Sequence, residues 1–359
     1  MKYYVSADLC DPAEARLLKP PFRVAWRVKN GGALVSFDET ALPILRELAA
    51  AAGWPRCEIW DRKRGVYTVT DEGLQWKERS FFPPTLHNLL VIQNLQRLPR
   101  IRADWDKANA RGKAICEGMA EPGIVPDGRV PLFFRYKRFI YARPDWERPM
   151  RYSLRSPKTK QDIPLLIYLH GGGYNRMSGL KPMFGGYGAL ACRLWFSREK
   201  HHMLIPQSSY GFNWNTDEFT QGLNAVIDSL PHVDRSRVYI MGTSYGGYGA
   251  IMECCRSPRR FAACLPCVAA MWNMKDVNGE PCQQLDDAAL DALAQTPIWM
   301  EYSGLERQSN EPLYEALKAR GADVRKTHIR LRGLFGHVVS PFVFSVAHDW
   351  VKWMFEHNL

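Results

Sequence analysis

The sequence predicts an α/β protein with a mostly parallel central sheet flanked by helices. One pattern supports this prediction, and it begins near residue 125. Short apolar runs that suit buried strands alternate with segments whose apolar residues recur at helical spacing. Such alternation favours parallel strands joined by helices on both faces of a sheet. We therefore expect a main domain over 125–359, preceded by an accessory region of mixed α and β structure over 1–120.

The first 120 residues contain strand-like runs but no motif that indicates chemistry. The expected strands are 1–7, 22–28, 33–37, 57–60 and 66–69. Asn30-Gly31-Gly32 predicts a hairpin turn, and Asp38 predicts the start of a helix over 41–52. Further helices are expected over 86–98 and 102–119. This region is a candidate dimer surface, which makes a homodimer one expectation, or a candidate wall over an active site.

The main domain is expected to open with two antiparallel strands, over 130–141 and 150–154. The later strands are expected at 164–169, 203–206, 238–241, 261–268, 297–302 and 324–331. The helices are expected at 187–198, 217–230, 286–294, 311–320 and 342–357. Segment 217–230 shows the helical pattern most clearly, because Phe219, Leu223 and Val226 recur at helical spacing.

Composition limits the partners. The chain has 359 residues, 46% of them hydrophobic, and a formal net charge of +11. The basic residues are spread along the chain rather than gathered in one long run, so a nucleic-acid partner is not expected. The first residues lack the apolar core of a signal peptide, and no apolar run is long enough to span a membrane. We expect a cytoplasmic protein with no membrane partner.

The cysteines indicate the same compartment. Nine cysteines is an odd number, and they lack the spacing of a disulfide framework. Several lie in apolar surroundings, which is typical of reduced core thiols. No cluster of cysteine, histidine or carboxylate residues has metal-ligand spacing, so we expect no metal and no cofactor.

Residues 237–250, RVYIMGTSYGGYGA, indicate a nucleophile. The apolar run 238–241 predicts a buried strand, and the residues after the glycines predict a helix that continues through Cys255. Ser244 lies between them in a G-x-S-x-G pattern, where a sharp turn holds a serine hydroxyl at the top of a sheet. The alternative is a glycine-rich turn whose serine only caps the helix.

A second glycine-rich turn lies upstream, in IPLLIYLHGGGY over 163–174. An apolar strand ends there in His170 and three glycines, which lets backbone N–H groups turn toward one point. We expect the N–H groups of Gly172 and Tyr245, with Gly171, to form an oxyanion hole. His170 is expected to shape the loop rather than act as a base. Two unrelated glycine turns are the alternative.

A serine nucleophile needs a base, and for this kind of turn the chain order is serine, acid, histidine. His337 fits the last position, in a loop expected between the last strand and the last helix. His328 and His348 are weaker candidates because they fall within the expected strand and helix. The alternative for His337 is an ordinary surface residue.

The acid should follow the strand over 297–302 and orient the imidazole. Glu306 is best placed for this role, with an exposed surface carboxylate as the alternative. Three weaker candidates are Glu301 within the strand, Glu311 in the first turn of the next helix and Asp276 after the preceding strand.

Residues from about 130 to 359 resemble the α/β-hydrolase superfamily. Within it they look like the esterase group that contains polyhydroxybutyrate depolymerase-like proteins, feruloyl esterases and predicted peptidases. The segments that carry the likeness are PLLIYLHGGG, Pro206 with Trp214, VDRSRVYIMGTSYGGYGA, RFAACLP, TPIWMEYSGLE and EALKARGADVRKTHI. The group usually has a Pro-x-Trp strand leading to a His-Gly-x-x-Asp loop. Here Tyr302-Ser303 replaces His-Gly, and Glu306 stands at the Asp position.

The motifs and the resemblance together imply the α/β-hydrolase fold and a serine esterase that acts on a small-molecule carboxylic ester. Ser244 would attack the acyl carbon, His337 would transfer the proton, and Glu306 would orient His337. A peptidase or acyltransferase with the same triad is one alternative. A non-catalytic binding protein of the same fold is another.

Three aromatic residues are expected to bind substrate. Tyr174, Trp214 and Trp272 follow predicted strands near the motifs and could line an aromatic pocket. Ordinary packing around the sheet is the alternative for each of them.

Overall fold

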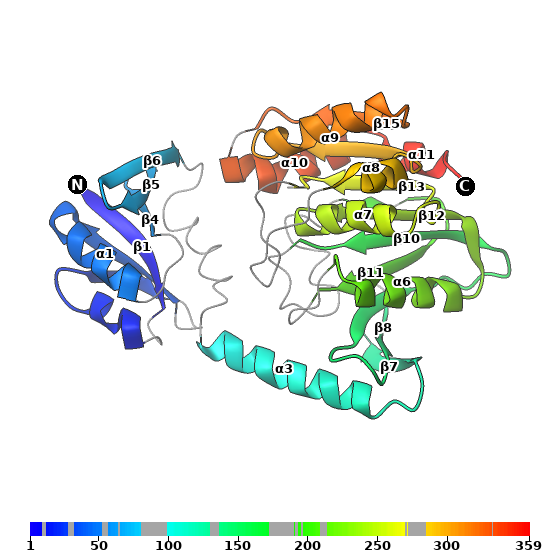
Figure 1. Ribbon diagram of the computed structural model, residues 1–359, viewed down its shortest axis with the longest axis horizontal. Coiled ribbons are helices and arrows are strands. Elements are labelled where there is room, and N and C mark those ends of the chain that lie inside the picture. Colours follow the sequence, from blue (N-terminus) through cyan, green and yellow to red (C-terminus); the bar gives the residue numbers. More distant parts are fainter. Residues whose placement is uncertain are drawn as a thin grey trace. The chain divides into compact units, whose positions relative to one another are not determined.

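The structure is a computed structural model that describes residues 1–8, 12–27, 32–51, 57–63, 65–79, 99–129, 136–171, 190, 193–194, 197–208, 214–269, 271, 285–331 and 333–359. These residues form two compact units (Figure 1). One consists of Met1–Ala108 with Gly333–Phe335, and the other of Asn109–Arg332 with Gly336–Leu359. The functional division expected from the sequence, at residues 120–125, stays a prediction.

The first unit is built on a six-stranded antiparallel sheet with the order β2-β3-β1-β4-β5-β6. Its elements are β1 (Lys2–Asp8), η1 (Pro12–Leu18), β2 (Arg23–Arg27), β3 (Gly32–Asp38), η2 (Glu39–Ala41), α1 (Leu42–Ala51), β4 (Glu58–Asp61), β5 (Gly65–Thr70) and β6 (Gly73–Arg79). Tyr3, Val5 and Ala7 of β1 enter one hydrophobic cluster, because alternate side chains of a strand share a face. Helix α1 adds Leu45 to this cluster.

The sequence anticipated every strand of this sheet except β6. Its sequence GLQWKER lacks the apolar alternation of a half-buried strand, because β6 lies at the edge of the sheet and leaves Trp76 exposed. The helix expected over 86–98 lies outside the described residues. Helix α3 (Pro99–Glu117) occupies most of the span expected over 102–119.

The second unit contains a nine-stranded sheet with the order β15-β14-β13-β12-β10-β11-β9-β8-β7. Its strands are β7 (Gly123–Arg129), β8 (Lys137–Ala142), β9 (Met150–Arg155), β10 (Ile163–Leu169), β11 (His202–Gln207), β12 (Val233–Thr243), β13 (Ala263–Cys267), β14 (Ile298–Tyr302) and β15 (Val324–His328). Strands β10 to β15 are parallel to one another, and β7, β8 and β9 extend the sheet in antiparallel fashion. The predicted mostly parallel sheet is confirmed.

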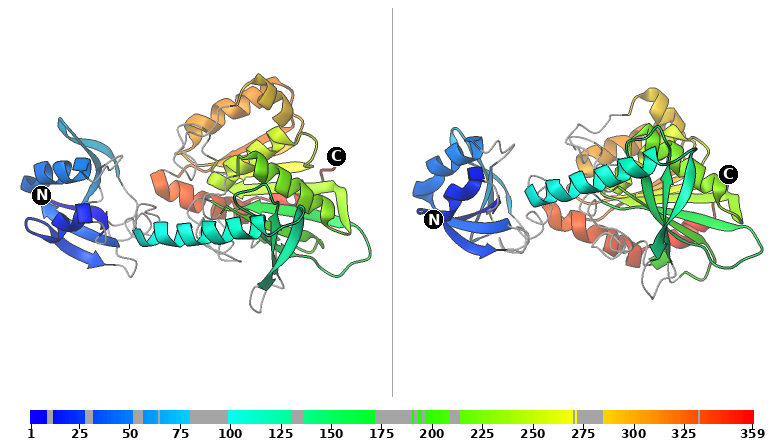
Figure 2. Two further views of the ribbon diagram at one scale, coloured as in Figure 1. Left: turned by 60° about the horizontal axis from the view of Figure 1, so that its bottom comes forward. Right: turned by 90° about the horizontal axis from the view of Figure 1, so that it is seen from below.

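Both faces of this sheet are buried. The helices are α6 (Asp217–Ser229), α7 (Tyr245–Arg256), α8 (Asp287–Leu293), α9 (Arg307–Ala319), α10 (Gly333–Ala347) and α11 (Trp350–Phe355). Leu165, Ile167 and Leu169 of β10 share a hydrophobic cluster with residues of α6 to α9. Leu166 and Tyr168 share another with residues of α10 and α11, which lie across the sheet from α7 to α9 (Figure 2). Burial on both faces explains why β10 is apolar throughout.

The prediction of one closing helix over 342–357 is wrong. The chain forms two helices there, because α10 begins at Gly333 and ends at Ala347, and α11 follows a break at Asp349. Gly336 and Pro341 are poor helix formers, so the sequence pattern concealed the first turns of α10.

Other elements also differ from the expectation. Strand β7 was not predicted, because Gly123 and Pro126 are typical of loops. Helix α9 begins at Arg307 rather than at 311, and Pro312 lies inside it, although proline is most common in the first turn of a helix. Most of the helix expected over 187–198 lies outside the described residues.

Candidate active site

Ser244 lies at a strained turn between β12 and α7. Its backbone has φ 58° and ψ −121°, a region that a non-glycine residue rarely adopts. Its side chain makes no capping hydrogen bond to α7, so the alternative of a simple helix cap does not describe it. Its N–H donates to the carbonyl of Cys267 at the end of β13, 2.9 Å away. The turn is thus tied to the neighbouring strand.

Glycines let the turn form, because other backbone atoms occupy the space of their missing side chains. A Cβ on Gly246 would overlap the carbonyl of Leu169 at the end of β10. A Cβ on Gly242 would overlap the carbonyl of Gly246 across the turn. The two glycines of the G-x-S-x-G pattern are therefore needed because α7 packs so closely against β10 and β12.

The structure brings Ser244, His337 and Glu306 together. His337 Nδ1 lies 2.6 Å from Glu306 Oε1, and His337 Nε2 lies 3.0 Å from Ser244 Oγ. Because a carboxylate only accepts, Nδ1–H donates to Glu306, which leaves Nε2 to accept from the serine hydroxyl. The three residues follow β12, β14 and β15, whose carboxyl ends share one edge of the sheet.

The prediction of a loop around His337 is wrong, because His337 lies in α10, near the start of that helix. The glycine before it reflects close packing rather than a loop. A Cβ on Gly336 would lie 2.6 Å from the carbonyl of Leu331 and 3.0 Å from Ser303 Oγ. This approach brings the first turns of α10 against the residues that follow β14.

Glu306 is a buried carboxylate with several donors. Its Oε2 accepts from the N–H of Ser303 at 3.0 Å and from the hydroxyl of Ser303 at 2.7 Å. Burial raises the pKa of Glu306, but the hydrogen bonds and charge of His337 and the two bonds from Ser303 outweigh it, so the pKa lies below its usual value. Glu306 therefore carries its charge at neutral pH. The sequence showed Ser303 only as a departure from the His-Gly pattern.

The other acid and base candidates lie elsewhere. Glu311 pairs with Lys326 at 2.7 Å, and Asp276 lies outside the described residues. His328 stacks on Tyr302, with ring centroids 5.4 Å apart. The ring of His348 stacks on Phe344 at 5.2 Å. Glu301 is buried in β14, which ends before Glu306 in the chain.

The expected oxyanion donors are described in part. Tyr245 is the first residue of α7, where a backbone N–H has no acceptor within its own helix. Gly171 is buried and directly follows His170, and Gly172 lies outside the described residues. A helix N-terminus beside the nucleophile favours negative charge, so Tyr245 N–H suits an oxyanion.

His170 holds the first residues of this loop. Its Nε2 accepts from the N–H of Ser208 at 3.1 Å, so its Nδ1–H donates to the carbonyl of Gly171 at 2.9 Å. Complete burial lowers the pKa of His170 to about 4, so the ring stays neutral. The described contacts agree with the expectation that His170 shapes the loop.

Trp214 is a packing residue in the described structure. Its side chain is 0% exposed and lies between Phe219 and Tyr245, with ring centroids 4.9 and 6.4 Å away. Its indole N–H donates to the carbonyl of His170 at 3.2 Å. The alternative interpretation, ordinary packing around the sheet, fits these contacts. Tyr174 and Trp272 lie outside the described residues.

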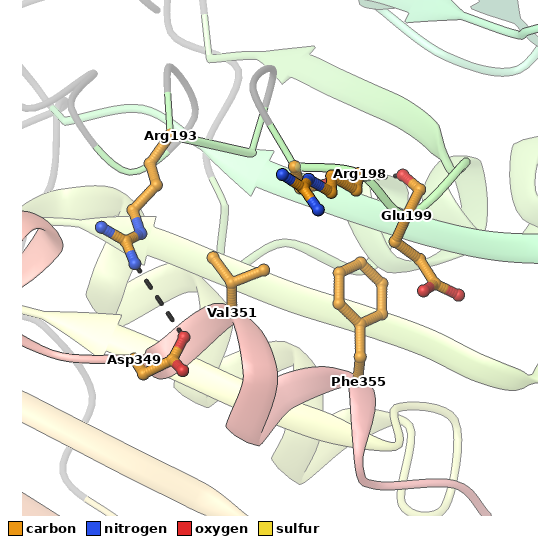
Figure 3. A pocket seen from close by; sticks show the side chains of 7 residues that line it. Arg193, Arg198, Glu199, Asp349, Val351 and Phe355 are labelled. Carbon is orange, nitrogen blue, oxygen red and sulfur yellow. Dashed lines mark hydrogen bonds and ion pairs between the residues drawn. The ribbon is translucent and has the colours of Figure 1, made fainter.

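Figure 3 shows a cavity of about 540 Å³ whose lining does not include Ser244. It is lined by Arg193, Ser197, Arg198, Glu199, Asp349, Val351 and Phe355. Residues 197–199 lie shortly before the amino end of β11, whereas the serine, histidine and glutamate follow the carboxyl ends of their strands. Arg193 and Asp349 form an ion pair at 3.9 Å beside this cavity. It does not belong to the candidate active site.

Two other kinds of feature, a metal-binding group and a membrane-spanning helix, are absent from the described residues. They hold no group of three or more histidine, cysteine or carboxylate residues that could bind a metal ion. Among the described helices, none is long and apolar enough to cross a membrane.

Comparisons with known proteins agree with this architecture. The prolyl oligopeptidase family (Peptidase_S9) matches residues 210–281, which include the turn at Ser244. A search of curated proteins found no match. The crystal structure of a thermostable esterase matches with a TM-score of 0.50 and 22% identity, over 62% of this chain and 63% of that one. The protein has the α/β-hydrolase fold.

Two other hydrolase structures match with lower scores. A Staphylococcus aureus S-formylglutathione hydrolase has a TM-score of 0.46 and 12% identity, over 66% of this chain and 98% of its own. A Pyrococcus horikoshii acylaminoacyl peptidase has a TM-score of 0.45 and 17% identity, over 84% of this chain and 48% of its own. The chain thus spans less than two thirds of the esterase and about half of the peptidase.

Gly246→Ala is expected to destabilise the hydrolase fold by about 3 kcal/mol or more, because the new methyl group would overlap the carbonyl of Leu169. Urea unfolding measures this loss. Gly123→Ala is the matched control, since its nearest neighbour is the flexible end of Met119 at 3.2 Å. Equal stability of the two variants would contradict the close packing described for the turn.

Ser303→Ala is expected to raise the pKa of Glu306, because it removes the hydroxyl donor to Oε2. The pKa of Glu306 is lowered in the fold, so its stabilisation is present above the ordinary value of 4.5 and is lost as the pH falls. The variant should therefore lose less stability than wild type between pH 6 and pH 3 in urea unfolding. Ser309→Ala is the control, since Ser309 Oγ donates to the backbone carbonyl of Glu306 and not to its carboxylate. Equal acid slopes would show that the Ser303 hydroxyl does not tune Glu306.

Proposed function

We propose that the protein is a serine hydrolase that cleaves a carboxylic ester through an acyl-enzyme intermediate. One observation carries the proposal, namely the continuous hydrogen-bonded chain from Ser244 through His337 to Glu306. These hydrogen bonds join a serine at a strained turn, a histidine with one nitrogen toward the serine, and a charged carboxylate. These are the parts that activate a weak hydroxyl nucleophile.

The first half of the reaction forms the acyl-enzyme. Ser244 Oγ attacks the acyl carbon of the ester while His337 Nε2 takes its proton. Glu306 accepts from Nδ1–H throughout, so it fixes the ring orientation and stabilises the imidazolium that forms. The negative charge on the carbonyl oxygen is stabilised by the N–H of Tyr245, with Gly171 or Gly172 as the second donor. His337 then gives its proton to the leaving alcohol.

The second half releases the acid. Water enters, His337 Nε2 takes one of its protons, and the hydroxide attacks the acyl carbon. When the tetrahedral intermediate collapses, the proton returns to Ser244 Oγ and the carboxylic acid leaves. These steps need no group beyond the residues named.

An ester is favoured as substrate by the resemblance to polyhydroxybutyrate depolymerase-like proteins and feruloyl esterases. The match to the prolyl oligopeptidase family over 210–281 favours a second candidate, a peptidase with the same triad. Ester and amide cleavage share the acyl-enzyme, and they differ in whether His337 must protonate an amine to expel it. An acyltransferase would differ only in the nucleophile that accepts the acyl group.

The remaining expectations complete the proposal. The substrate is a small-molecule ester, with neither nucleic acid nor membrane as a partner, and the protein acts in the cytoplasm. A homodimer through the accessory region stays part of the proposal. Tyr174 and Trp272 are the proposed aromatic lining of the substrate pocket.

Ser244→Ala is expected to lower kcat for short p-nitrophenyl esters by at least about 10³-fold, since the nucleophile is lost. Ser236→Ala is the matched control, because Ser236 lies on the same strand and is exposed. Steady-state kinetics of both variants check the proposal, with a peptide p-nitroanilide assayed beside the ester. Full activity of Ser244→Ala on the ester would exclude the proposed nucleophile, and faster cleavage of the anilide by wild type would favour the peptidase.

A further inference from the structure

Asn310 is a buried asparagine on α9 that the proposed mechanism does not use. Its side chain is 0% exposed. Its Nδ2 donates to two backbone carbonyls, that of Ala269 and, at 3.0 Å, that of Glu306. Because a carbonyl oxygen only accepts, the amide nitrogen rather than the amide oxygen faces both of them. The Asn310 amide therefore joins two segments that are distant in the chain.

The first of these segments, residues 267–269, supports the nucleophile. The carbonyl of Cys267 accepts from the Ser244 N–H at 2.9 Å. A Cβ on Gly247, in the first turn of α7, would lie 2.9 Å from that carbonyl and 3.0 Å from the Cβ of Ala269. The segment is thus packed against the turn that carries Ser244, and a shift of the segment would move that turn.

The same segment contains a second strained residue. Val268 has φ 45°, a left-handed conformation that a β-branched residue rarely adopts and that persists only where the surroundings enforce it. The Val268 N–H donates to the carbonyl of Glu301 at 2.7 Å. The carbonyl of the next residue, Ala269, accepts from Asn310. The Asn310 amide is therefore one of the bonds that hold the chain in this conformation.

The second segment carries the acid. Glu306 directly precedes α9, and its backbone carbonyl accepts from the backbone N–H of Asn310 at 2.9 Å as well as from the side-chain amide. The carboxylate of Glu306 lies 2.6 Å from His337 Nδ1. Asn310 thus holds the backbone of the acid, while His337 binds its carboxylate.

The amide of Asn310 has a cost that packing does not explain. Its Oδ1 is buried and has no hydrogen-bond partner in the part of the chain that the structure describes. A buried acceptor without a partner destabilises a fold, and such exceptions are rare. An apolar side chain would avoid this cost, so the contribution of Asn310 lies in the N–H groups that it donates.

We propose that Asn310 is a positioning residue that sets the distance between the nucleophile and the acid. Its amide joins the segment that supports Ser244 to the segment that carries Glu306, so that His337 reaches both. This inference rests on the proposed function. Without the amide, residues 267–269 relax from the strained conformation and Ser244 shifts relative to His337. The chemical step then slows without a change in ester binding, so kcat falls while KM stays unchanged.

The test measures steady-state kinetics of Asn310→Ala on a p-nitrophenyl ester. Its kcat is expected to fall about tenfold or more with KM unchanged, because a misplaced catalytic group costs rate rather than binding. Wild-type kcat in this variant, or a loss seen only in KM, would overturn the inference.

Ser309→Ala is the matched control. Ser309 Oγ donates to the same carbonyl of Glu306 at 2.9 Å and lies 3.1 Å from Asn310 Nδ2, but no bond among the described residues joins it to Ala269. Its kcat is expected to stay close to the wild-type value. Equal losses of kcat in Ser309→Ala and Asn310→Ala would overturn the inference, because the bond to Ala269 would then make no difference.

Hydrogen exchange followed by mass spectrometry adds a readout that needs no substrate. In Asn310→Ala, the backbone N–H groups of residues 263–269 are expected to exchange several-fold faster than in wild type, because the strained segment loses one of its supports. In Ser309→Ala they are expected to exchange at the wild-type rate. Unchanged exchange in Asn310→Ala would overturn the inference.

Asn310→Ser keeps the inference testable if Asn310→Ala does not fold. A serine within a helix donates to the carbonyl four residues before it, so this variant keeps a bond to Glu306 and loses the one to Ala269. Lower kcat and faster exchange are expected again, and wild-type values of both would overturn the inference. Failure of the proposed function has a different outcome. In that case neither wild type nor any variant cleaves the ester, while exchange over 263–269 still separates Asn310→Ala from Ser309→Ala.

Discussion

The left-handed backbone at Ser244 is the constraint on which the rest of the site depends. A serine rarely holds φ near 58°, so the surroundings must enforce it. They do so through the packing of Gly246 against the end of β10 and through the bond from the Ser244 N–H to Cys267 on β13. The strain is therefore spread over three neighbouring strands and α7. It aims the hydroxyl at His337 and leaves the N-terminus of α7 beside it, where negative charge is favoured.

Two buried carboxyl groups from one short segment differ in charge because their donors differ. Glu306 receives bonds from His337 and from both donors of Ser303, so it stays ionised in spite of burial. The carboxyl group of Glu301 has no hydrogen-bond partner among the described residues, and burial together with the charge of Glu306 raises the pKa of Glu301 to about 8, so it stays neutral. Environments that separate the pKa values of neighbouring acids are typical of active sites.

The sequence predicted what local patterns encode. Strand, glycine turn and helix around Ser244 follow one another in the chain, and Glu306 could be counted from the strand before it. His337 could be identified by order, but not its helix, because Gly336 is required by a contact with Leu331 that only the fold reveals. The same limit hid the burial of Trp214, whose indole N–H donates to the carbonyl of His170, which is distant in the chain. Ser303 is close to Glu306 in the chain, but the turn that directs its hydroxyl at Glu306 Oε2 is not visible in the sequence pattern.

The most direct test of the central claim is covalent labelling with a fluorophosphonate, followed by mass spectrometry of the intact protein and of its peptides. The account predicts one adduct on the peptide that contains Ser244, formed much more slowly in His337→Ala, because the imidazole activates the hydroxyl. An adduct on a different residue, or no adduct on folded wild-type protein, would contradict it.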